Sequence, residues 1–453
     1  MKTSKARKLE GQHPQFTEEE LKVYGETFSR MLQCATVSVK DQHDDTEFAK
    51  LRAVVEADFP LLHEKAERMI LAEDCWMYKI PGRNPSRNIL LMSHHDVVPA
   101  DDDWTMPAFE GIIKDGKVYG RGAADTKGSL CAILFGMEEM LREGIVPPVN
   151  VYIVSSHNEE LGGNGMSATL KYCQENGITF EVILDEGGAI VEPPLPGMNC
   201  EMCAMVAVHE KGRLKLKCTA RNESSHVSLT AFKGNPVERM SQFIHEITTK
   251  NIFIRRINPQ TKAMFTTLAP YCKFPMKFVF RNLWLFGGIL LKVLPKMNAT
   301  AGGMVGTTCN FQKIEGSTND KVCTSSVMLR NINEEDLKAD YAAFKAVADK
   351  YGITLETERD EYYAPADMDS PAYAYTMDCL AKVFPRFPAA PYILPAGTDA
   401  WRLTPVCNCV LRFAPTRMSK QQLGSIHSAD ENLDISAIGE AAAFYKYFAV
   451  NYK

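Results

Sequence analysis

The alternation of short apolar runs with helical patterns between residues 88 and 185 constrains the fold of this chain more than any other feature of its sequence. Residues 89–92, 149–154 and 181–184 form short, largely apolar runs that are typical of buried strands. After Gly128 the apolar residues recur at helical spacing, as Leu130, Ile133, Leu134, Met137 and Leu141. Strands that alternate with helices indicate a sheet with helices on both faces. We therefore expect an α/β fold with a central, mostly parallel sheet.

A second pattern interrupts the first one after about residue 205. Residues 213–220 alternate like a half-exposed strand, and an amphipathic helix begins near Asn235. Asn333 is placed to cap another helix, which precedes a last strand at residues 353–358. The chain then returns to further helix and strand and ends in an alanine-rich helix. These patterns predict an α+β domain inserted into the α/β domain.

The charge balance gives no sign of a polyanionic partner. The 453 residues carry 51 lysines and arginines against 56 aspartates and glutamates, which is a formal net charge of −5. Proteins that bind nucleic acids usually show a basic excess. We therefore expect a small-molecule substrate and no nucleic acid.

The cysteines and the N-terminal stretch predict a cytoplasmic protein. Thirteen cysteines, an odd number, are scattered along the chain and indicate no disulfide framework. The basic stretch MKTSKARKLEGQHPQF is not followed by the apolar core of a secretory signal. The longest apolar run, residues 283–294, contains Lys292 and is shorter than the roughly 18 residues that a membrane span needs. It predicts a buried or interfacial helix, and contact with a membrane surface stays open.

Five short segments carry side chains that could bind a metal ion. They are SHHDVVP at 93–99, GRGAADTKG at 120–128, HNEELGG at 157–163, ILDEGG at 183–188 and IHSADEN at 426–432. Four of them follow predicted strands or form tight turns, where an open α/β sheet places its sites. The ligands that they offer are His94, Asp125, Glu160, Asp185 and His427. Two imidazoles and three carboxylates, one of them able to bridge, are what a pair of zinc ions requires.

Each segment has a plain structural interpretation when it is taken alone. The His-His-Asp sequence at 94–96 could cap a strand, and Glu159 with Glu160 could open a helix, where negative charge is favourable. Asp185 and Glu186, followed by two glycines, could form a turn. The combination of all five segments in one chain favours the metal site.

With these motifs in this order, the chain resembles the dinuclear zinc exopeptidases and deacylases that include aminoacylase, carboxypeptidase G, acetylornithine deacetylase and carboxypeptidase S. The carboxypeptidase S branch is the most similar one, and the resemblance runs from about residue 88 to 435. It implies a zinc-exopeptidase-like catalytic domain made of residues 1–205 and 362–453. It also implies that residues 206–361 form a lid and dimerisation domain, so that the protein is a homodimer.

The resemblance implies a role for each candidate ligand. His94 and Asp185 would hold one metal ion, Glu160 and His427 would hold the other, and Asp125 would bridge the two. We expect two divalent ions per chain, with zinc as the first choice and cobalt or manganese as alternatives.

The resemblance also implies catalytic roles beside the metals. Asp96 would orient His94, as carboxylates commonly do behind a zinc-bound imidazole. Glu159 would be the general base, because one of two adjacent carboxylates in a turn can bind a metal while the other faces the water. His95 and His157 fall where the family motif needs no ligand, so we interpret them as bystanders.

A second set of residues is expected to contact the substrate. His226 in ESSHVS is similar to the histidine that, in the family, reaches the developing oxyanion from the partner subunit, although two serines replace two glycines. Asn319 resembles the family's substrate-contacting asparagine. Gly397 and Thr398 resemble its substrate loop.

The chain departs from the carboxypeptidase S pattern where a substrate carboxylate would be bound. Trp401 takes the position of an arginine that could bind a carboxylate bidentately, and Arg402 follows one residue later. Arg330 is an alternative carboxylate ligand, and its plain interpretation is a structural salt bridge. Asn158 replaces an acidic residue that usually precedes the two glutamates.

Together these motifs predict a dinuclear hydrolase that cleaves an amide bond of a small peptide or an N-acyl amino acid. A non-catalytic metal-binding or ligand-binding relative is the main alternative, and the intact Glu159 argues against it. A dinuclear phosphoesterase would need a basic pocket near the ligand motifs, and the sequence shows no such cluster there.

Overall fold

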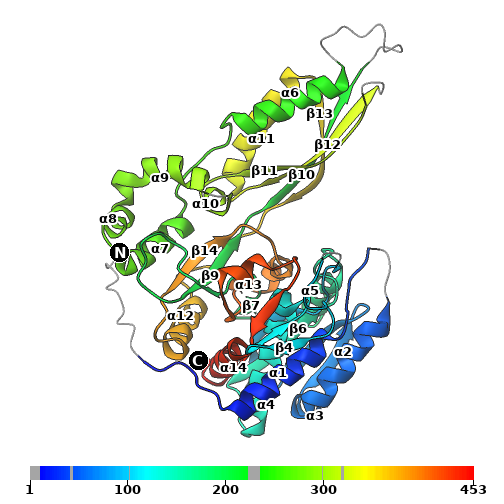
Figure 1. Cartoon of the computed structure of the whole chain (residues 1–453), viewed down its shortest axis with the longest axis vertical. Coiled ribbons are helices and arrows are strands. Elements are labelled where there is room, and N and C mark those ends of the chain that lie inside the picture. The colour runs from blue at the N-terminus through cyan, green and yellow to red at the C-terminus, as the bar shows by residue number, and fades with distance from the viewer. Residues whose placement is uncertain (1–10, 41–43, 101–102, 223–234, 298, 318–320) are drawn as a thin grey trace.

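A ten-stranded sheet forms the larger part of this computed structural model, and a smaller sheet lies above it in Figure 1. The structure describes residues 11–40, 44–100, 103–222, 235–297, 299–317 and 321–453. The strands of the large sheet, in spatial order, are β1 (Glu67–Leu71), β2 (Cys75–Ile80), β6 (Val149–Ser156), β3 (Asn84–His94), β7 (Ile183–Asp185), β15 (Val410–Arg412), β9 (Cys203–Glu210), β8 (Ile190–Val191) and β16 (Arg417–Met418), with β14 (Ala389–Leu394) paired to β9. The central neighbours β6, β3, β7 and β15 run parallel, so the expected α/β fold with a mostly parallel sheet is confirmed.

Burial on both faces explains why the central strands are apolar throughout. In β3, Ile89 and Leu91 belong to the core on one face of the sheet, whereas Leu90 and Met92 belong to the core on the other. Successive side chains of a strand point to opposite faces, so a strand covered on both faces needs a continuous apolar run.

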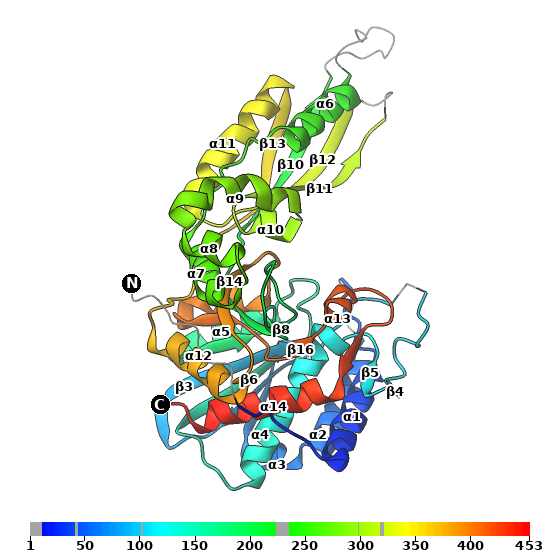
Figure 2. The same ribbon diagram turned by 60° about the vertical axis from the view of Figure 1, so that its left-hand side comes forward.

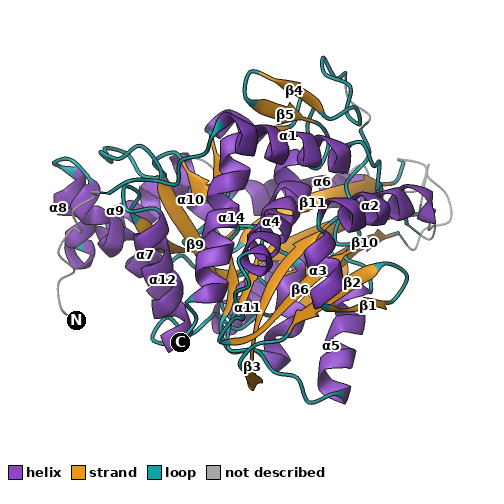
Figure 3. Ribbon diagram, turned by 90° about the horizontal axis from the view of Figure 1, so that it is seen from below, coloured by secondary structure: helices purple, strands orange, loops and turns teal. Residues whose placement is uncertain are grey.

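Two layers of helices provide this cover. On the first face pack α1 (Glu18–Leu32), α2 (Asp45–Asp58), α3 (Pro60–Lys65), α4 (Gly128–Arg142), α12 (Pro371–Val383) and α14 (Ile435–Val450). On the second face pack α5 (Gly165–Glu175) and a 3₁₀ helix, Asp399–Val406. Figure 3 shows α4 and α14 side by side, and a Cβ at Gly136 of α4 would lie only 2.7 Å from the carbonyl oxygen of Ala442. The helix predicted after Gly128 is therefore confirmed. Gly136 allows α4 and α14 to approach each other closely.

The smaller sheet is antiparallel and is covered on one face by two helices. Its strands, in spatial order, are β11 (Thr308–Glu315), β12 (Val322–Arg330), β10 (Arg213–Arg221) and β13 (Ile353–Glu361). Its helices are α6 (Pro236–Thr249) and α11 (Glu334–Lys350). The side chain of Asn235 caps α6 by accepting a hydrogen bond from the backbone N–H of Glu238 at 2.8 Å. The side chain of Asn333 caps α11 in the same way, with the backbone N–H of Asp336 at 2.7 Å. The strands and helices expected in this part of the chain are confirmed.

The chain passes directly from the large sheet to the small one. Strand β9 stays in the large sheet to Glu210, which lies beyond the predicted boundary at residue 205, and β10 begins at Arg213 in the small sheet. The chain leaves the small sheet after Glu361. The first connection between the two sheets thus consists of residues 211 and 212 alone.

Four helices of the inserted segment lie at the junction of the two sheets, as Figure 2 shows. They are α7 (Pro259–Leu268), α8 (Met276–Arg281), α9 (Leu283–Met297) and α10 (Ala299–Gly303). Their core includes Met205 of β9 and Ala390 of β14 from the large sheet. The inserted segment therefore extends the large domain as well as forming the small sheet.

A three-stranded sheet brings the C-terminal motif to the rest of the site. It pairs β17 (Asn432–Asp434) with β5 (Lys117–Tyr119), and β5 with β4 (Ile112–Lys114). The short strand β17 follows α13 (Lys420–Gly424) and the segment that carries His427. In the described ranges, no helix has both the length and the apolar character to cross a membrane.

Candidate metal centre

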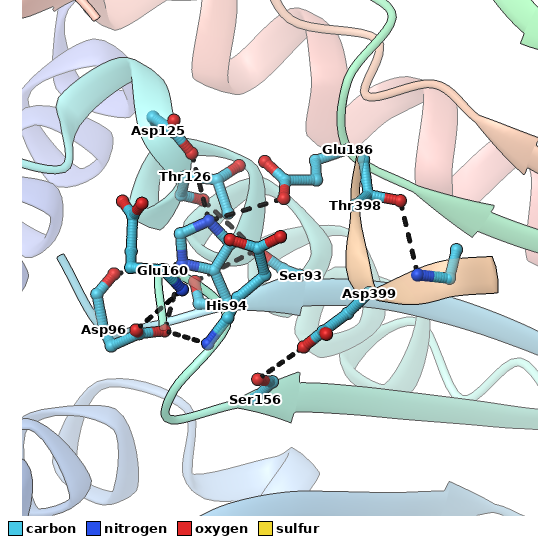
Figure 4. A network of polar contacts seen from close by, with 12 residues as sticks. Ser93, His94, Asp96, Asp125, Thr126, Ser156, Glu160, Glu186, Thr398 and Asp399 are labelled. Atoms are coloured by element: carbon cyan, nitrogen blue, oxygen red, sulfur yellow. Dashed lines mark hydrogen bonds and ion pairs between the residues drawn. The ribbon is translucent and has the colours of Figure 1, made fainter. Parts of the chain in front are cut away.

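Five segments that are far apart in sequence meet at the carboxyl ends of parallel strands. His94 ends β3, Glu159 and Glu160 follow β6, and Glu186 follows β7. Asp125 lies in the turn Ala123–Lys127 before α4, and Figure 4 shows its carboxylate directed at the ring of His94. This edge of the sheet borders a cavity of about 580 Å³.

Asp125 lies between two histidines and presents one carboxylate oxygen to each. Its Oδ1 is 3.0 Å from Nε2 of His94, and its Oδ2 is 3.1 Å from Nε2 of His427. Nε2 of His427 is also 3.2 Å from Oε1 of Glu160. One carboxylate between two groups of ligands is the arrangement of a bridging ligand in a dinuclear site.

The structure places Glu186, and not Asp185, beside His94. Oε1 of Glu186 is 3.5 Å from Nε2 of His94, and Figure 4 shows the carboxylate directed at this ring. The side chain of Glu186 also lines the cavity. Asp185 is buried at the end of β7 and belongs to neither group of candidate ligands in the described chain. Adjacent residues of an extended segment point to opposite sides, so only one of the two can face the site. The interpretation of Asp185 as the partner of His94 therefore has to be corrected to Glu186.

The donor set fits divalent cations. Ligand atoms of His94, Asp125 and Glu160 lie within 4.8 Å of one another, and so do those of His94, Glu159 and Glu186. Imidazole nitrogens and carboxylate oxygens are ligands that zinc takes. The metal site that the sequence predicts thus has a matching cluster in the structure.

The pKa shifts of these groups also indicate a site for a cation. Burial and the nearby charge of Asp125 raise the pKa of Glu186 to about 8. Hydrogen bonds to Asp125 and Glu160 raise the pKa of His427 to about 10. Burial opposes the charged form of His94, but Glu186, Asp125 and Asp96 outweigh it and raise the pKa of this histidine. The pocket therefore concentrates negative charge and favours any cation that enters it.

Asp96 connects His94 with the turn that carries both glutamates. Nδ1 of His94 lies 3.0 Å from the carbonyl oxygen of Asp96 and 3.3 Å from its Oδ1. The same carboxylate accepts hydrogen bonds from the backbone N–H groups of Glu159, at 3.1 Å, and Glu160, at 3.2 Å, and from the hydroxyl of Ser38. A proton on Nδ1 leaves Nε2 free for a cation, which is the arrangement that the predicted role of Asp96 needs.

Glu159 lies beside the candidate ligands, at the edge of the metal site. Its carboxylate accepts no hydrogen bond from any described residue, although its backbone is held by Asp96. Burial and the charge of Glu186 raise its pKa well above the usual value. A carboxylate with a raised pKa at the edge of a metal site is suited to accept a proton from water.

Glu431 is a supporting residue that the sequence analysis missed. It is fully buried and accepts hydrogen bonds from the backbone N–H groups of Ala124, at 2.7 Å, Asp125, at 3.0 Å, and Gly122, at 3.1 Å. Arg121 donates a further one at 2.9 Å. Glu431 thus fixes the turn that presents Asp125. The only sequence signal for Glu431 is its place in the IHSADEN segment, in which His427 is the predicted ligand.

The loop at Gly397 and Thr398 lines the same cavity. The hydroxyl of Thr398 accepts the backbone N–H of Ala400, and the Thr398 N–H donates to Glu210 at 3.1 Å. A Cβ at Gly397 would lie 2.0 Å from Nη2 of Arg213, so a larger residue at this position would displace the guanidinium group of that arginine. The predicted substrate loop therefore contacts the first residue of the small sheet.

The arginines around the cavity differ from the prediction. Arg402 pairs with Asp399 at 2.7 Å and stacks on Trp401, so its guanidinium has structural partners. Arg330 does not line the cavity, which Arg213 and Arg359 border instead. Nε of Arg213 and Nη1 of Arg330 are buried and have no hydrogen-bond partner within the described ranges. Burial and the charge of Arg213 lower the pKa of Arg330, although the charge of Glu210 opposes this shift.

The remaining predicted residues are placed as follows. His95 is buried and stacks on Trp76, and neither it nor His157 belongs to a group of candidate ligands in the described ranges. Asn158 donates to the Asn164 side chain at 2.8 Å and accepts from the backbone of Gly165. Asn158 therefore stabilises the turn that carries Glu159 and Glu160, at the position where the family usually has an acidic residue. The predicted substrate residues His226 and Asn319 lie outside the described residues.

A protein-family model described as "Peptidase family M20/M25/M40" matches residues 90–451. This range contains every candidate ligand.

Two curated relatives match along nearly the whole chain. Probable carboxypeptidase S-like 2 of Dictyostelium discoideum is 30% identical over 448 residues, which cover 91% of this chain and 80% of that protein. The N-fatty-acyl-amino acid synthase/hydrolase PM20D1 of Xenopus tropicalis is 26% identical over 458 residues, which cover 95% of this chain and 86% of that protein.

Solved structures share the fold. An M20 family metallo-carboxypeptidase of Sulfolobus solfataricus superposes with a TM-score of 0.66 at 18% identity, covering 96% of this chain and 99% of that one. The YXEP protein of Bacillus subtilis, described as a dinuclear metal-binding peptidase, superposes with a TM-score of 0.58 at 13% identity, covering 95% of this chain and 98% of that one.

Proposed function

Since the chain belongs to peptidase family M20/M25/M40 and is a metal-dependent hydrolase of amide bonds, we propose that it cleaves N-acyl amino acids with two bound divalent cations, zinc first among them. The single observation that carries the dinuclear part is the position of Asp125, with one oxygen at each histidine. Cobalt and manganese are the alternative metals. A small peptide is the alternative substrate.

One cation would be held by His94 and Glu186, the other by Glu160 and His427, and Asp125 would be shared. Cations at these ligands would polarise the substrate carbonyl and lower the pKa of water. The protein's own part is to hold the ligands, and the hydrogen bonds of Asp96 and Glu431 support this proposal because they fix His94 and the Asp125 turn.

Glu159 would move the proton. It would take a proton from the attacking water while the oxygen of that water bonds to the carbonyl carbon. The carbon–nitrogen bond then breaks, and Glu159 would return the proton to the leaving amine, so that a carboxylic acid and a free amino acid result. Its carboxylate lies beside the ligands and accepts no hydrogen bond from the part of the chain that the structure describes, which supports this role.

The substrate carboxylate would bind at Arg213, with Arg330 beside it. The positive charges of Arg213 and Arg330 repel each other, and the charge of Glu210 offsets only part of this repulsion, so a bound carboxylate would reduce it further. The loop at Gly397 and Thr398 would form the adjacent wall. We further propose that the protein is a cytoplasmic homodimer in which His226 of one subunit reaches the oxyanion of the other and Asn319 contacts the substrate.

Removal and return of metal is the direct test of the proposed function. Metal-free protein should be inactive, and zinc, cobalt or manganese should restore turnover at close to two ions per chain. A library of N-acyl amino acids and dipeptides, followed by mass spectrometry, should identify the amides that are cleaved. Turnover by metal-free protein would contradict the proposal. Two tightly bound ions without turnover of any amide would instead favour a non-catalytic relative.

Arg213→Ala should lower kcat/KM for N-acyl amino acids by about 10- to 150-fold, because it removes a charge-assisted hydrogen bond to the substrate carboxylate. The matched control is the same substrate with its carboxylate blocked as an amide. For that compound the wild-type and variant rates should be nearly equal. An equal loss on both substrates would mean that Arg213 acts on the fold of the loop and not on the carboxylate.

A further inference from the structure

Helices α8 and α9, together with the residues before them, expose a group of large apolar side chains at the surface. Trp284 is 83% exposed and Phe274 is 82% exposed, although side chains of this size are usually covered. The apolar face consists of Phe274, Phe278, Trp284, Leu285, Ile289, Val293 and Met297. Soluble proteins seldom leave such a contiguous group uncovered without a binding role.

The opposite side of α9 anchors the helix to the protein. Leu290 and Leu294 are buried in the core that contains Phe265 and Phe280. The exposed residues Leu285, Ile289 and Val293 recur four positions apart and therefore share one side of the helix. The apolar face is thus held in a fixed orientation and is not an unfolded segment.

The charge of this part of the chain is strongly one-sided. Between residues 247 and 314 the sequence contains no aspartate or glutamate, although the whole chain has a net charge of −5. The lysines and arginines in this stretch are Lys250, Arg255, Arg256, Lys262, Lys273, Lys277, Arg281, Lys292, Lys296 and Lys313. Within the described ranges, no acidic side chain forms an ion pair with Lys273, Lys277, Arg281, Lys292 or Lys296. Apolar and basic residues therefore coincide on one surface.

We propose that α8 and α9 dock the protein on the surface of a membrane that contains anionic lipids. Trp284 and its apolar neighbours enter the boundary between headgroups and acyl chains, where tryptophan is favoured. Lys292 and Lys296 lie on the same exposed side and contact lipid phosphates and carboxylates. The helix is only 15 residues long, so it lies on the membrane and does not span it.

A second copy of the chain is a less suitable occupant of this surface. A symmetric dimer through the apolar face would bring the same basic segment against itself, because a two-fold interface pairs each patch with its own copy. No acidic residue lies within the stretch to offset that repulsion. Anionic lipid offers the opposite charge together with an apolar layer.

Vesicle binding tests the proposal directly. The full-length protein should co-sediment with phosphatidylcholine vesicles that contain phosphatidylserine, and much less with phosphatidylcholine alone, and salt should weaken the binding. The fluorescence of Trp284 should shift to the blue on binding, since this side chain leaves water. Trp284→Phe should abolish the shift while it keeps the binding, because Trp76 is already buried and Trp104 and Trp401 pack against Arg121 and Arg402 away from α8 and α9.

Two sets of variants separate the apolar and the basic contributions. Trp284→Ser with Ile289→Ser, and separately Lys292→Glu with Lys296→Glu, should each weaken vesicle binding by at least about tenfold. The matched controls are Ile70→Ser, at a side chain that is 54% exposed on β1, and Lys171→Glu with Lys345→Glu on α5 and α11. The controls should bind vesicles like the wild type.

Several outcomes would overturn the proposal. They are the absence of binding to vesicles of either composition, and equal binding by the test and control variants. The proposal would also fail if analytical ultracentrifugation showed a dimer of the wild type and a monomer of the double variant Trp284→Ser with Ile289→Ser. A second copy of the chain would then cover the apolar face.

Discussion

Glu159→Gln is expected to keep both cations, the fold and substrate binding, while kcat falls by at least about 10² to 10⁴. The amide is nearly the size of the carboxylate, so packing is preserved, and the backbone N–H of residue 159 can still donate to Asp96. Only the capacity to accept a proton from water is removed. Metal content by mass spectrometry, thermal unfolding and steady-state kinetics would be measured on the same preparation.

Glu160→Gln is the matched control in the same turn. Because Oε1 of Glu160 lies 3.2 Å from the His427 imidazole, its loss should weaken cation binding at that pair. The assignment of the two glutamates is wrong if Glu159→Gln keeps kcat within a few fold. It is also wrong if Glu159→Gln loses a cation while Glu160→Gln does not.

Asp125→Ala should lose both cations and all measurable hydrolysis, since its two oxygens face both halves of the centre. Ligand binding to the native state stabilises it, by about 2.7 kcal/mol at a ligand concentration of 100 times Kd. Saturating zinc should therefore raise the melting temperature of the wild type but not that of the variant. Equal melting temperatures of the two metal-free proteins would show that the fold is intact.

Asp185→Asn and Glu186→Gln give this experiment its internal comparison. Glu186→Gln should weaken one cation site, whereas Asp185→Asn should leave both sites occupied, because only Glu186 lies beside His94. Retention of two tightly bound ions by Asp125→Ala would refute the bridging role. Loss of a cation from Asp185→Asn alone would restore the original interpretation of the ILDEGG segment.

The sequence predicts most of the large domain because its signals are local. The apolar runs of β3 and β6 follow from burial on both faces, and the helical spacing after Gly128 follows from the one face that α4 buries. The same pattern indicates the edge of the sheet where the ligands gather. The boundary at residue 205 was less accurate, because β9 continues in the large sheet to Glu210 before the chain crosses over.

The errors at the site have a common physical cause. Asp185 and Glu186 are adjacent acids, and which one faces the cavity depends on where β7 ends and not on composition. The alternating pattern of residues 213–220 predicts a strand but does not place Arg213 at the cavity, because its contact with Gly397 joins residues that are far apart in sequence. Glu431 supports the Asp125 turn through backbone N–H groups, which carry no side-chain signature.

The short connection at residues 211–212 has a consequence for timing within a catalytic cycle. Arg213 is the first residue of β10, next to this connection, whereas Arg221 ends the strand at its far side. At about 3.3 Å per residue, the last residue of this nine-residue strand lies about 26 Å from the first one. If the small sheet pivots about this connection, Arg213 sweeps a short arc and keeps its hold on an anchored ligand. Arg221, at the far end of the same strand, sweeps a long one. A substrate could then stay bound at Arg213 while the far end of the small sheet still moves, so that binding of the substrate and closure of the small sheet would be separate events.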